Sequence, residues 1–269
     1  MNAVLEALQL KADMEDVQSC KDDRCLPINH VGIKDLEHPI ILHEPGATQT
    51  TIATCSFYVA LPAQQRGTHM SRFISIMEEH YRNISIHQFQ SMPAHVTEVL
   101  DAESSRIEMT FKMFRNKTAP ISGLQSLMDY QVSLTGEYSG EASETLIKVA
   151  VPATSLCPCS KKISDYGAHN QRSLITLTVK PRDFISIVDL IDIAENNASA
   201  EVFSLVKRDD EKYLTEHAYN NPKFVEDIVR DLALSLNSDP RISGFRVETE
   251  NYESIHNHSA YAMIDRLSK

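Results

Sequence analysis

The chain has 269 residues, and its 26 Lys and Arg residues against 37 Asp and Glu residues give a net charge of −11. At roughly 150 residues per domain, this length predicts about two structural units. The acidic excess argues against DNA, RNA or an anionic membrane as the main partner, because each of these is itself negatively charged.

No segment approaches the roughly 20 apolar residues that are needed to cross a bilayer. The amino terminus contains acidic residues and no sustained apolar run, so it does not resemble a secretory signal. The five cysteines are an odd number, which indicates cytoplasmic thiols rather than a disulfide framework. We therefore expect a cytoplasmic protein without a membrane partner.

The first half of the chain begins with residues 1–33, which show no clear periodicity and predict an irregular arm. Alternating apolar residues then predict a strand over 55–61. Apolar residues at three- and four-residue spacing predict helices over 70–81 and 87–101, with Pro93 marking a kink. Alternation returns and predicts strands over 107–113 and 130–135.

The second half repeats this order. Strands are predicted over 147–151 and 175–179, then a helix over 186–196 and another that begins at Pro222 with Asn221 as its cap. Two strands follow over 242–250 and 258–264. We expect an α+β fold with helices on one face of an antiparallel sheet, divided into modules 34–140 and 141–269. The lack of a glycine-rich phosphate loop argues against a Rossmann or P-loop enzyme.

A cysteine pair marks the end of a predicted strand. Cys157 and Cys159 flank Pro158, which fixes the backbone between them, and His169 follows Cys157 by twelve residues. A thiolate and an imidazole suit a borderline-soft divalent metal. The residues alone leave two interpretations open, because such thiols are also found as structural or incidental groups.

Two further polar segments have the residue types of a metal or proton-transfer site. The acidic segment 209–211 lies between predicted helices, where one carboxylate would complete a Cys/His/carboxylate set. Glu253, His256 and His258 lie between the last two strands, where their side chains can converge. The plainer interpretations are a solvated acidic loop and a polar hairpin loop.

Basic residues open the first predicted helix. Arg66, His69 and Arg72 lie near backbone N–H groups at its amino end, an arrangement that suits an anion such as phosphate. The alternative is a solvated helix start. Glu226 flanks the apolar stripe of a later helix, so it points either to solvent or into a cleft.

Long stretches of the sequence resemble the type IB GTP cyclohydrolase I family, the prokaryotic form of this enzyme. The matching segments are 61–73, 155–160, 166–173, 221–227 and 253–258, and the resemblance extends from about residue 35 to the carboxyl end. It implies a tunnelling fold of two ββααββ modules and a homotetramer with sites at subunit interfaces. It also implies that GTP and water give 7,8-dihydroneopterin triphosphate and formate, the first step towards tetrahydrofolate.

The resemblance also implies roles for individual residues. Cys157, His169 and Glu211 would bind Mn²⁺, Fe²⁺ or Zn²⁺, and Glu226 would anchor guanine. Glu253 and His256 would lie near the metal as ligands or proton carriers, with Cys159 as an active-site thiol. The triphosphate would meet residues from the set Arg66, His69, Arg72, Lys161, Lys162 and Arg172.

Three other functions fit parts of the pattern. A tunnelling-fold nitrile reductase of queuosine synthesis uses a nucleophilic cysteine and NADPH, and it predicts hydride consumption without a metal. A non-catalytic metal-binding protein would bind metal without any dependence on GTP. A structural oligomer would use the polar clusters as interface contacts.

Overall fold

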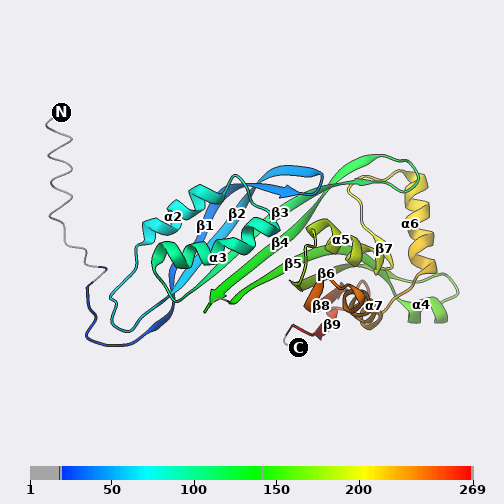
Figure 1. Cartoon of the computed structure of the whole chain (residues 1–269). Coiled ribbons are helices and arrows are strands. Elements are labelled where there is room, and N and C mark those ends of the chain that lie inside the picture. The colour runs from blue at the N-terminus through cyan, green and yellow to red at the C-terminus, as the bar shows by residue number, and fades with distance from the viewer. Residues whose placement is uncertain (1–17, 19, 141, 268–269) are drawn as a thin grey trace.

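One antiparallel sheet forms the frame of the molecule. The computed structural model describes residues 18, 20–140 and 142–267. Neighbouring strands follow chain order, except that β6 pairs with β8 and the short β7 pairs with β5, and the sheet extends along the molecule (Figure 1). The strands are β1 (Ile28–Glu44), β2 (Ala47–Leu61), β3 (Ser104–Thr118), β4 (Gln125–Ser139), β5 (Ala142–Leu156), β6 (Asn170–Pro181), β7 (Ala200–Glu201), β8 (Ile242–Tyr252) and β9 (Ser259–Asp265).

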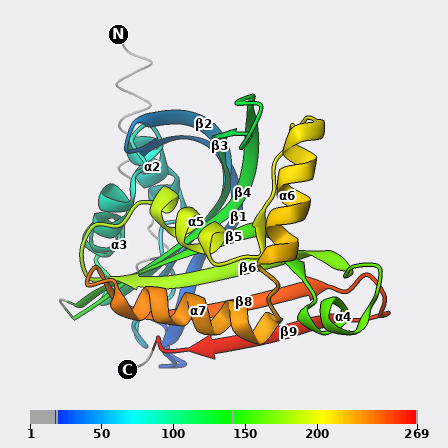
Figure 2. The same ribbon diagram turned by 90° about the vertical axis from the view of Figure 1, so that its right-hand side faces the viewer.

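Helices α2, α3, α5 and α7 cover one face of the sheet, whereas α6 stands apart from them (Figure 2). Ala218 of α6 packs against Leu156 and Ala200 in a small separate cluster. No helix within the described ranges is long and apolar enough to cross a membrane. The helices are α2 (Met70–His80), α3 (Ile86–Leu100), α4 (Pro158–Ile163), α5 (Ile187–Asn196), α6 (Arg208–Asn220) and α7 (Val225–Ser238).

A single large core lies between the sheet and these four helices. Alternate strand residues such as Phe57 and Phe111 are buried there against Phe73 and Phe89 of the helices. Gly136 of β4 allows α3 to approach closely, because a Cβ atom at this position would lie 2.8 Å from the Pro93 Cγ atom. The apolar periodicity of strands and helices therefore has its expected cause, which is burial of one face of each element.

The predicted α+β class and antiparallel sheet are confirmed, but the boundary of the amino-terminal arm is not. Residues 1–17 and 19 of the predicted arm lie outside the described residues, and β1 already begins at Ile28. The sequence pattern did not predict this strand, because its register with β2 shifts between Ile33 and Leu36, where Asp35 has φ = 57°. Such a bulge interrupts the two-residue alternation from which strands are predicted. The division into modules 34–140 and 141–269 stays a prediction.

Two predictions around the last helices are corrected. The acidic segment 209–211 is not a loop but the first turn of α6, where carboxylates complement the helix dipole. Helix α7 begins at Val225 rather than Pro222, because the Asp227 carboxylate accepts the Phe224 N–H at 3.0 Å and so caps the helix there. Asn221 ends α6 instead of capping α7.

Asp210 fixes α6 to the β3–β4 connection. Its carboxylate accepts the N–H groups of Ile121 and Ser122 at 2.9 Å, the Ser122 hydroxyl at 2.6 Å and the Lys207 N–H at 2.8 Å. The bond from the Ser122 hydroxyl, with the backbone bonds, holds the pKa of Asp210 well below its ordinary value. The acidic segment thus contains a structural carboxylate beside the exposed Glu211.

Glu44 gives the fold a predicted pH dependence. It ends β1, is buried, and its Oε2 atom accepts the Ile187 N–H at the start of α5 at 3.0 Å. Burial raises its pKa to about 7, from an ordinary value of 4.5. The folded state therefore keeps a proton that the unfolded chain releases between about pH 4.5 and pH 7. The free energy of unfolding should fall across this window by at most about 3 kcal/mol.

The matched variants are Glu44→Gln, which has no carboxyl group to titrate, and Glu37→Gln at an exposed position of the same strand. Urea unfolding at pH 5 and pH 8 should show a smaller pH dependence in Glu44→Gln and an unchanged one in Glu37→Gln. Equal pH dependence in all three proteins would refute the assignment to Glu44.

Candidate functional site

The centre of the candidate site is Cys157, which lies between the end of β5 and the start of α4. Its Sγ atom accepts the Ser160 N–H at 3.4 Å, and the Ser160 hydroxyl donates to the Cys157 carbonyl at 3.1 Å. Pro158 occupies the first position of the helix, where a missing N–H costs nothing. The sulfur is therefore held at a defined place at the end of the sheet, whereas Cys159 is exposed on α4.

His169 lies beside Cys157 because β5 and β6 pair up to Leu156 and Asn170. The Cys157 N–H donates to the His169 carbonyl at 3.1 Å, and the Ser160 hydroxyl accepts the His169 N–H at 3.3 Å. The segment from Cys157 to His169 is thus closed at its base by the sheet. The twelve-residue spacing noted in the sequence corresponds to this loop between paired strands.

The imidazole of His169 is oriented through its Nδ1 atom. This atom lies 2.9 Å from Gln171 Oε1 and 3.3 Å from the Ser254 hydroxyl oxygen. Since the amide oxygen only accepts, this hydrogen bond requires the hydrogen on Nδ1 and would leave the lone pair on Nε2. Metal-binding histidines are commonly held in this way, by a hydrogen bond from the second ring nitrogen to a carbonyl or carboxylate oxygen. Together with the nearby thiol, this donor set fits a divalent transition metal.

A chain of buried polar side chains supports Gln171. Its Nε2 atom donates to the Ser155 hydroxyl at 3.0 Å, and the Ser173 hydroxyl lies 2.9 Å from Ser155 Oγ and 2.7 Å from Asn251 Oδ1. These residues connect β5, β6 and β8. These residues were not among the predicted site residues, although polar residues at the inward positions of otherwise apolar strands are a signal for such a network.

The loop between β8 and β9 reaches the same end of the sheet through Ser254. Glu253 is half-buried there, and His256 is exposed with its ring stacked on that of His258 at 5.1 Å between centroids. The loop was predicted between the last two strands, and it lies there. No contact of Glu253 or His256 with Cys157 is recorded within the described part of the chain, so their roles stay predictions.

Two helices bring further predicted residues to this end. Lys161 of α4 donates to the Tyr219 carbonyl of α6, and its Nζ atom lies 4.3 Å from the centre of the Tyr219 ring. The Lys223 N–H donates to the Leu156 carbonyl at 3.1 Å, which places the start of α7 next to the end of β5. Glu226 is exposed in the first turn of α7, three residues after Lys223.

Glu211 is not brought to Cys157 and His169 within one chain. It is exposed in the first turn of α6, eight residues before Tyr219, which amounts to about 12 Å along a helix. Among the residues that the structure describes, Glu79, His80 and His95 form the one group of three metal-type side chains with close ligand atoms. The proposed set of Cys157, His169 and Glu211 is therefore not assembled within the described part of one chain.

The basic segment at the start of α2 lies at the opposite end of the sheet. Arg66 follows β2. Strands β2, β3, β4 and β5 alternate in direction, so the end of β2 lies at the same end of the sheet as the start of β5. The Arg66 N–H donates to the Cys20 carbonyl at 3.1 Å, and Arg72 donates to the Val99 carbonyl at 3.1 Å. His69 is the cap residue of α2. A strand of 15 residues is roughly 45–50 Å long, so these residues are far from Cys157 in the same chain.

Arg172 lines a hollow on the sheet face opposite the main helices. The hollow has a volume of about 580 Å³, and Lys112, Gln131 and Phe203 are also among its lining residues. Arg172 pairs with Thr154 across the β5–β6 ladder, two residues before Leu156. It is therefore close to the Cys157 end along the ladder, although Cys157 does not line the hollow.

The fold and the thiol–imidazole pair at a strand end define an α+β protein of the tunnelling-fold class. Two uricase crystal structures share this fold, with TM-scores of 0.51 for the enzyme from Arthrobacter globiformis and 0.52 for that from Bacillus fastidious. The first covers 90% of this chain and 94% of its own at 9% identity, and the second covers 88% and 93% at 7% identity. At such low identity the likeness concerns the fold alone.

The chain belongs to the Type I GTP cyclohydrolase folE2 family, whose model matches residues 14–262. A relative from Nitrosococcus oceani named GTP cyclohydrolase FolE2 is 53% identical over 99% of both chains. A relative of the same name from Methylobacillus flagellatus is 55% identical over 94% of this chain and 96% of its own. The predicted resemblance to GTP cyclohydrolase I is confirmed, and folE2 is a more exact family term than type IB.

We predict that His169 is in the tautomer with hydrogen on Nδ1. In Gln171→Leu, which removes the accepting oxygen but keeps a side chain of similar size, this preference should be lost. The ¹⁵N chemical shifts of the ring nitrogens at neutral pH measure the tautomer directly.

The control is Gln125→Leu at an exposed position of β4, which should leave the His169 shifts unchanged. Hydrogen on Nε2 in the unaltered protein would show that Gln171 does not orient the ring.

Proposed function

We propose that the chain is a type IB GTP cyclohydrolase I of the cytoplasm, which converts GTP and water into 7,8-dihydroneopterin triphosphate and formate, the first step of tetrahydrofolate biosynthesis. The observation that carries this proposal is the orientation of His169 beside Cys157 in a chain of this family. The odd number of five cysteines favours a reducing compartment over a disulfide framework. The family match favours this reaction over nitrile reduction, metal storage or a purely structural role.

A divalent metal fits the residues of the candidate site. Cys157 Sγ and His169 Nε2 would bind it, with Glu211 as the third ligand, and Mn²⁺, Fe²⁺ and Zn²⁺ all accept such a set. When bound, the metal supplies hydroxide at neutral pH by lowering the pKa of water. The chain itself contributes the fixed direction of the His169 lone pair, through Gln171 and the buried polar chain behind it.

The guanine base is recognised by Glu226 in this proposal. A carboxylate accepts hydrogen bonds from both the ring N–H and the exocyclic amino group of guanine, which is a planar two-point contact. Glu226 is exposed in the first turn of α7, and the start of α7 is bonded to the end of β5. In this proposal, an incoming base reaches both Glu226 and the Cys157 segment.

The reaction needs several proton transfers around C8 of guanine. Water adds at C8, the imidazole ring opens, formate leaves after a second hydration, and an Amadori rearrangement of the ribose precedes closure of the pterin ring. His256, Glu253 and Cys159 are exposed or half-buried residues on the adjoining loop and helix, and we assign the proton transfers to them. His169 is less suited to this task, because its free lone pair is used for the metal.

The complete site combines residues from more than one copy in this proposal. Glu211 and the triphosphate-binding residues Arg66, His69 and Arg72 lie away from Cys157 within one chain, whereas Lys161, Lys162 and Arg172 lie on the elements that adjoin it. Among the described strands, β1 and β9 are the edges of the sheet, and further copies can add strands there in this proposal. In the proposed homotetramer, opposite ends of neighbouring chains would lie together and complete the site.

The test of this function is formate release from GTP by the metal-free protein with and without added divalent ions. Cys157→Ala should abolish release while the fold persists, because the backbone bonds of residue 157 remain. Cys25→Ala, at an exposed position outside the site, is the matched control and should keep full activity. Near-normal turnover by Cys157→Ala with metal supplied would remove Cys157 from the site.

A site that is shared between two copies of the chain can be tested by mixing two inactive variants. Cys157→Ala and Glu211→Ala should each be inactive, but a mixture that is unfolded and reassembled should regain about a quarter of the sites by random pairing. Each restored site takes Cys157 from one copy and Glu211 from the other. A mixture that stays inactive, although mixed oligomers form, would place both residues in the same chain.

Glu226→Ala should weaken GTP binding by about 10- to 100-fold, since a charged hydrogen bond contributes about 1.5–3 kcal/mol. Equilibrium dialysis with GTP and metal-free protein measures this without turnover. Glu216→Ala, which removes an exposed carboxylate from α6, is the control for net charge. An unchanged GTP affinity in Glu226→Ala would contradict the anchoring role.

A further inference from the structure

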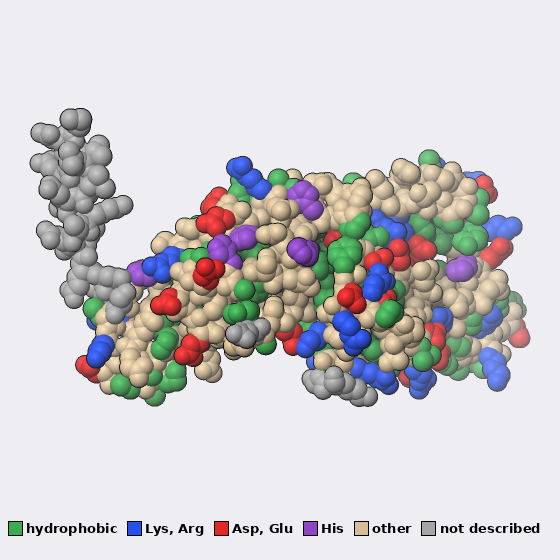
Figure 3. Space-filling model, viewed as in Figure 1, with side chains coloured by type: hydrophobic (Ala, Val, Ile, Leu, Met, Phe, Trp, Pro, Cys, Tyr) green, Lys and Arg blue, Asp and Glu red, His purple; other side chains and the backbone are tan. Residues whose placement is uncertain are grey.

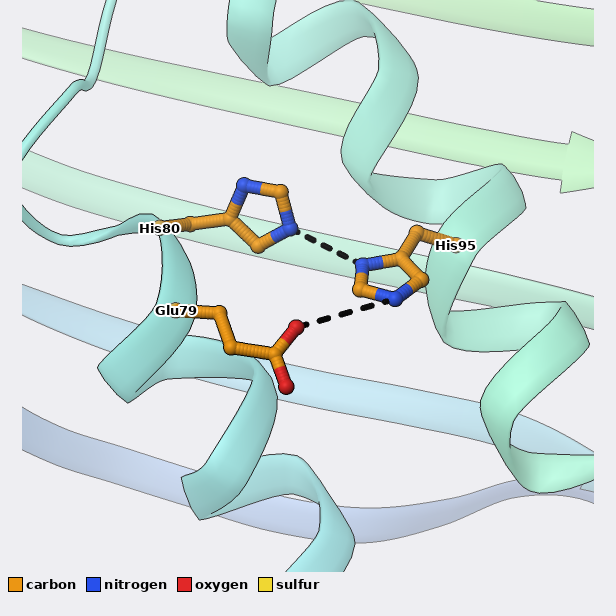
Figure 4. A group of neighbouring side chains, drawn as sticks. All are labelled: Glu79, His80 and His95. Carbon is orange, nitrogen blue, oxygen red and sulfur yellow. Dashed lines mark hydrogen bonds and ion pairs between the residues drawn. The ribbon is translucent and has the colours of Figure 1, made fainter.

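A second set of metal-type side chains lies between α2 and α3, outside the site described above (Figure 4). Glu79 and His80 belong to the last turn of α2, and His95 belongs to α3. His80 Nε2 lies 2.9 Å from His95 Nδ1, and a Glu79 carboxylate oxygen lies 3.8 Å from His95 Nε2. One ligand atom from each residue lies within 4.8 Å of the other two.

The two imidazoles are held in place while remaining within reach of solvent. Both are half-buried, with ring centres 5.1 Å apart at 69°, and the Glu79 side chain is 61% exposed. Histidine side chains gather on this surface over α2 and α3 (Figure 3). An ion can therefore enter from solvent, and Glu79 can rotate towards it without disturbing the core.

This group is far from Cys157 within the chain. The Gln90 carbonyl of α3 accepts a hydrogen bond from Ser143 at the start of β5, at 3.5 Å. Cys157 follows the other end of the same strand, roughly 45 Å away at 3.3 Å per residue. A metal between α2 and α3 would therefore not belong to the Cys157–His169 site of its own chain.

We propose that Glu79, His80 and His95 bind a divalent ion of the Zn²⁺ type and so join α2 to α3. His80 Nε2 and His95 Nδ1 are the nitrogen ligands, Glu79 supplies an oxygen, and water completes the shell. Two imidazoles and one carboxylate favour Zn²⁺, Co²⁺ or Ni²⁺ over Mg²⁺ and Ca²⁺, which prefer oxygen ligands. The hydrogen now shared by the two nitrogens moves to the other nitrogen of its own ring when the ion binds.

The test uses Zn²⁺ and the full chain in the Cys157→Ala background, which removes a ligand of the other proposed site. After equilibration with excess Zn²⁺ and desalting, one tightly held equivalent per chain should remain. His80→Gln with His95→Gln should lose it, and His87→Gln, at an exposed position of α3, should keep it. Equal zinc content in all three proteins would overturn the proposal.

A second measurement covers the case in which the double variant does not fold. Glu79→Gln changes only an exposed side chain, and it should weaken Zn²⁺ affinity at least 10-fold and reduce the rise in Tm that Zn²⁺ produces. An unchanged affinity would exclude Glu79 as a ligand and with it the three-residue site. The outcome is independent of the proposed reaction: in an otherwise unaltered chain, His80→Gln with His95→Gln should leave formate release from GTP unchanged.

Discussion

The order of strands in the sheet is the constraint on which the rest of the molecule depends. Because neighbouring strands follow the chain and alternate in direction, successive connections fall at opposite ends of the sheet. The segment with Arg66 and the loop with Cys157 are therefore separated by the length of a 15-residue strand. No local movement can bring them together without breaking the ladder, so a site that uses both needs more than one copy of the chain.

The buried polar side chains behind His169 show a second constraint, because positions that support the orientation of the ring are lost to apolar packing. Ser155, Gln171 and Ser173 occupy inward strand positions that elsewhere hold Ile, Leu or Val, such as Ile175 and Leu177. A buried polar group without a partner costs about 1–3 kcal/mol, but each of these groups has one. The core has fewer apolar contacts here, and these polar groups instead support the Gln171 amide that contacts the His169 ring.

The sequence predicted the fold class well because burial of one face leaves a periodic trace in most strands and helices. This periodicity was not visible in two elements. A bulge at Asp35 interrupts the alternation in β1. Helix α6 has few apolar residues, because most of its surface is exposed. At the site, the closeness of Cys157 and His169 follows from strand pairing, which spacing alone does not establish. The position of Glu211 in the first turn of α6 was not predicted, because the acidic segment lacks the apolar periodicity that reveals a helix.

The net charge of −11 does not oppose a triphosphate once the acidic residues are placed. Several carboxylates have structural tasks, such as Asp210 at the β3–β4 connection, Glu44 at the start of α5 and Glu195 beside the buried Lys117. At physiological salt, exposed charges are screened over about 8 Å, so a bound polyphosphate responds to its immediate neighbours. Arg66 and Arg72 at one end of the sheet and Lys161 at the other form such local surroundings. In the proposed assembly, these groups from neighbouring copies would surround one triphosphate.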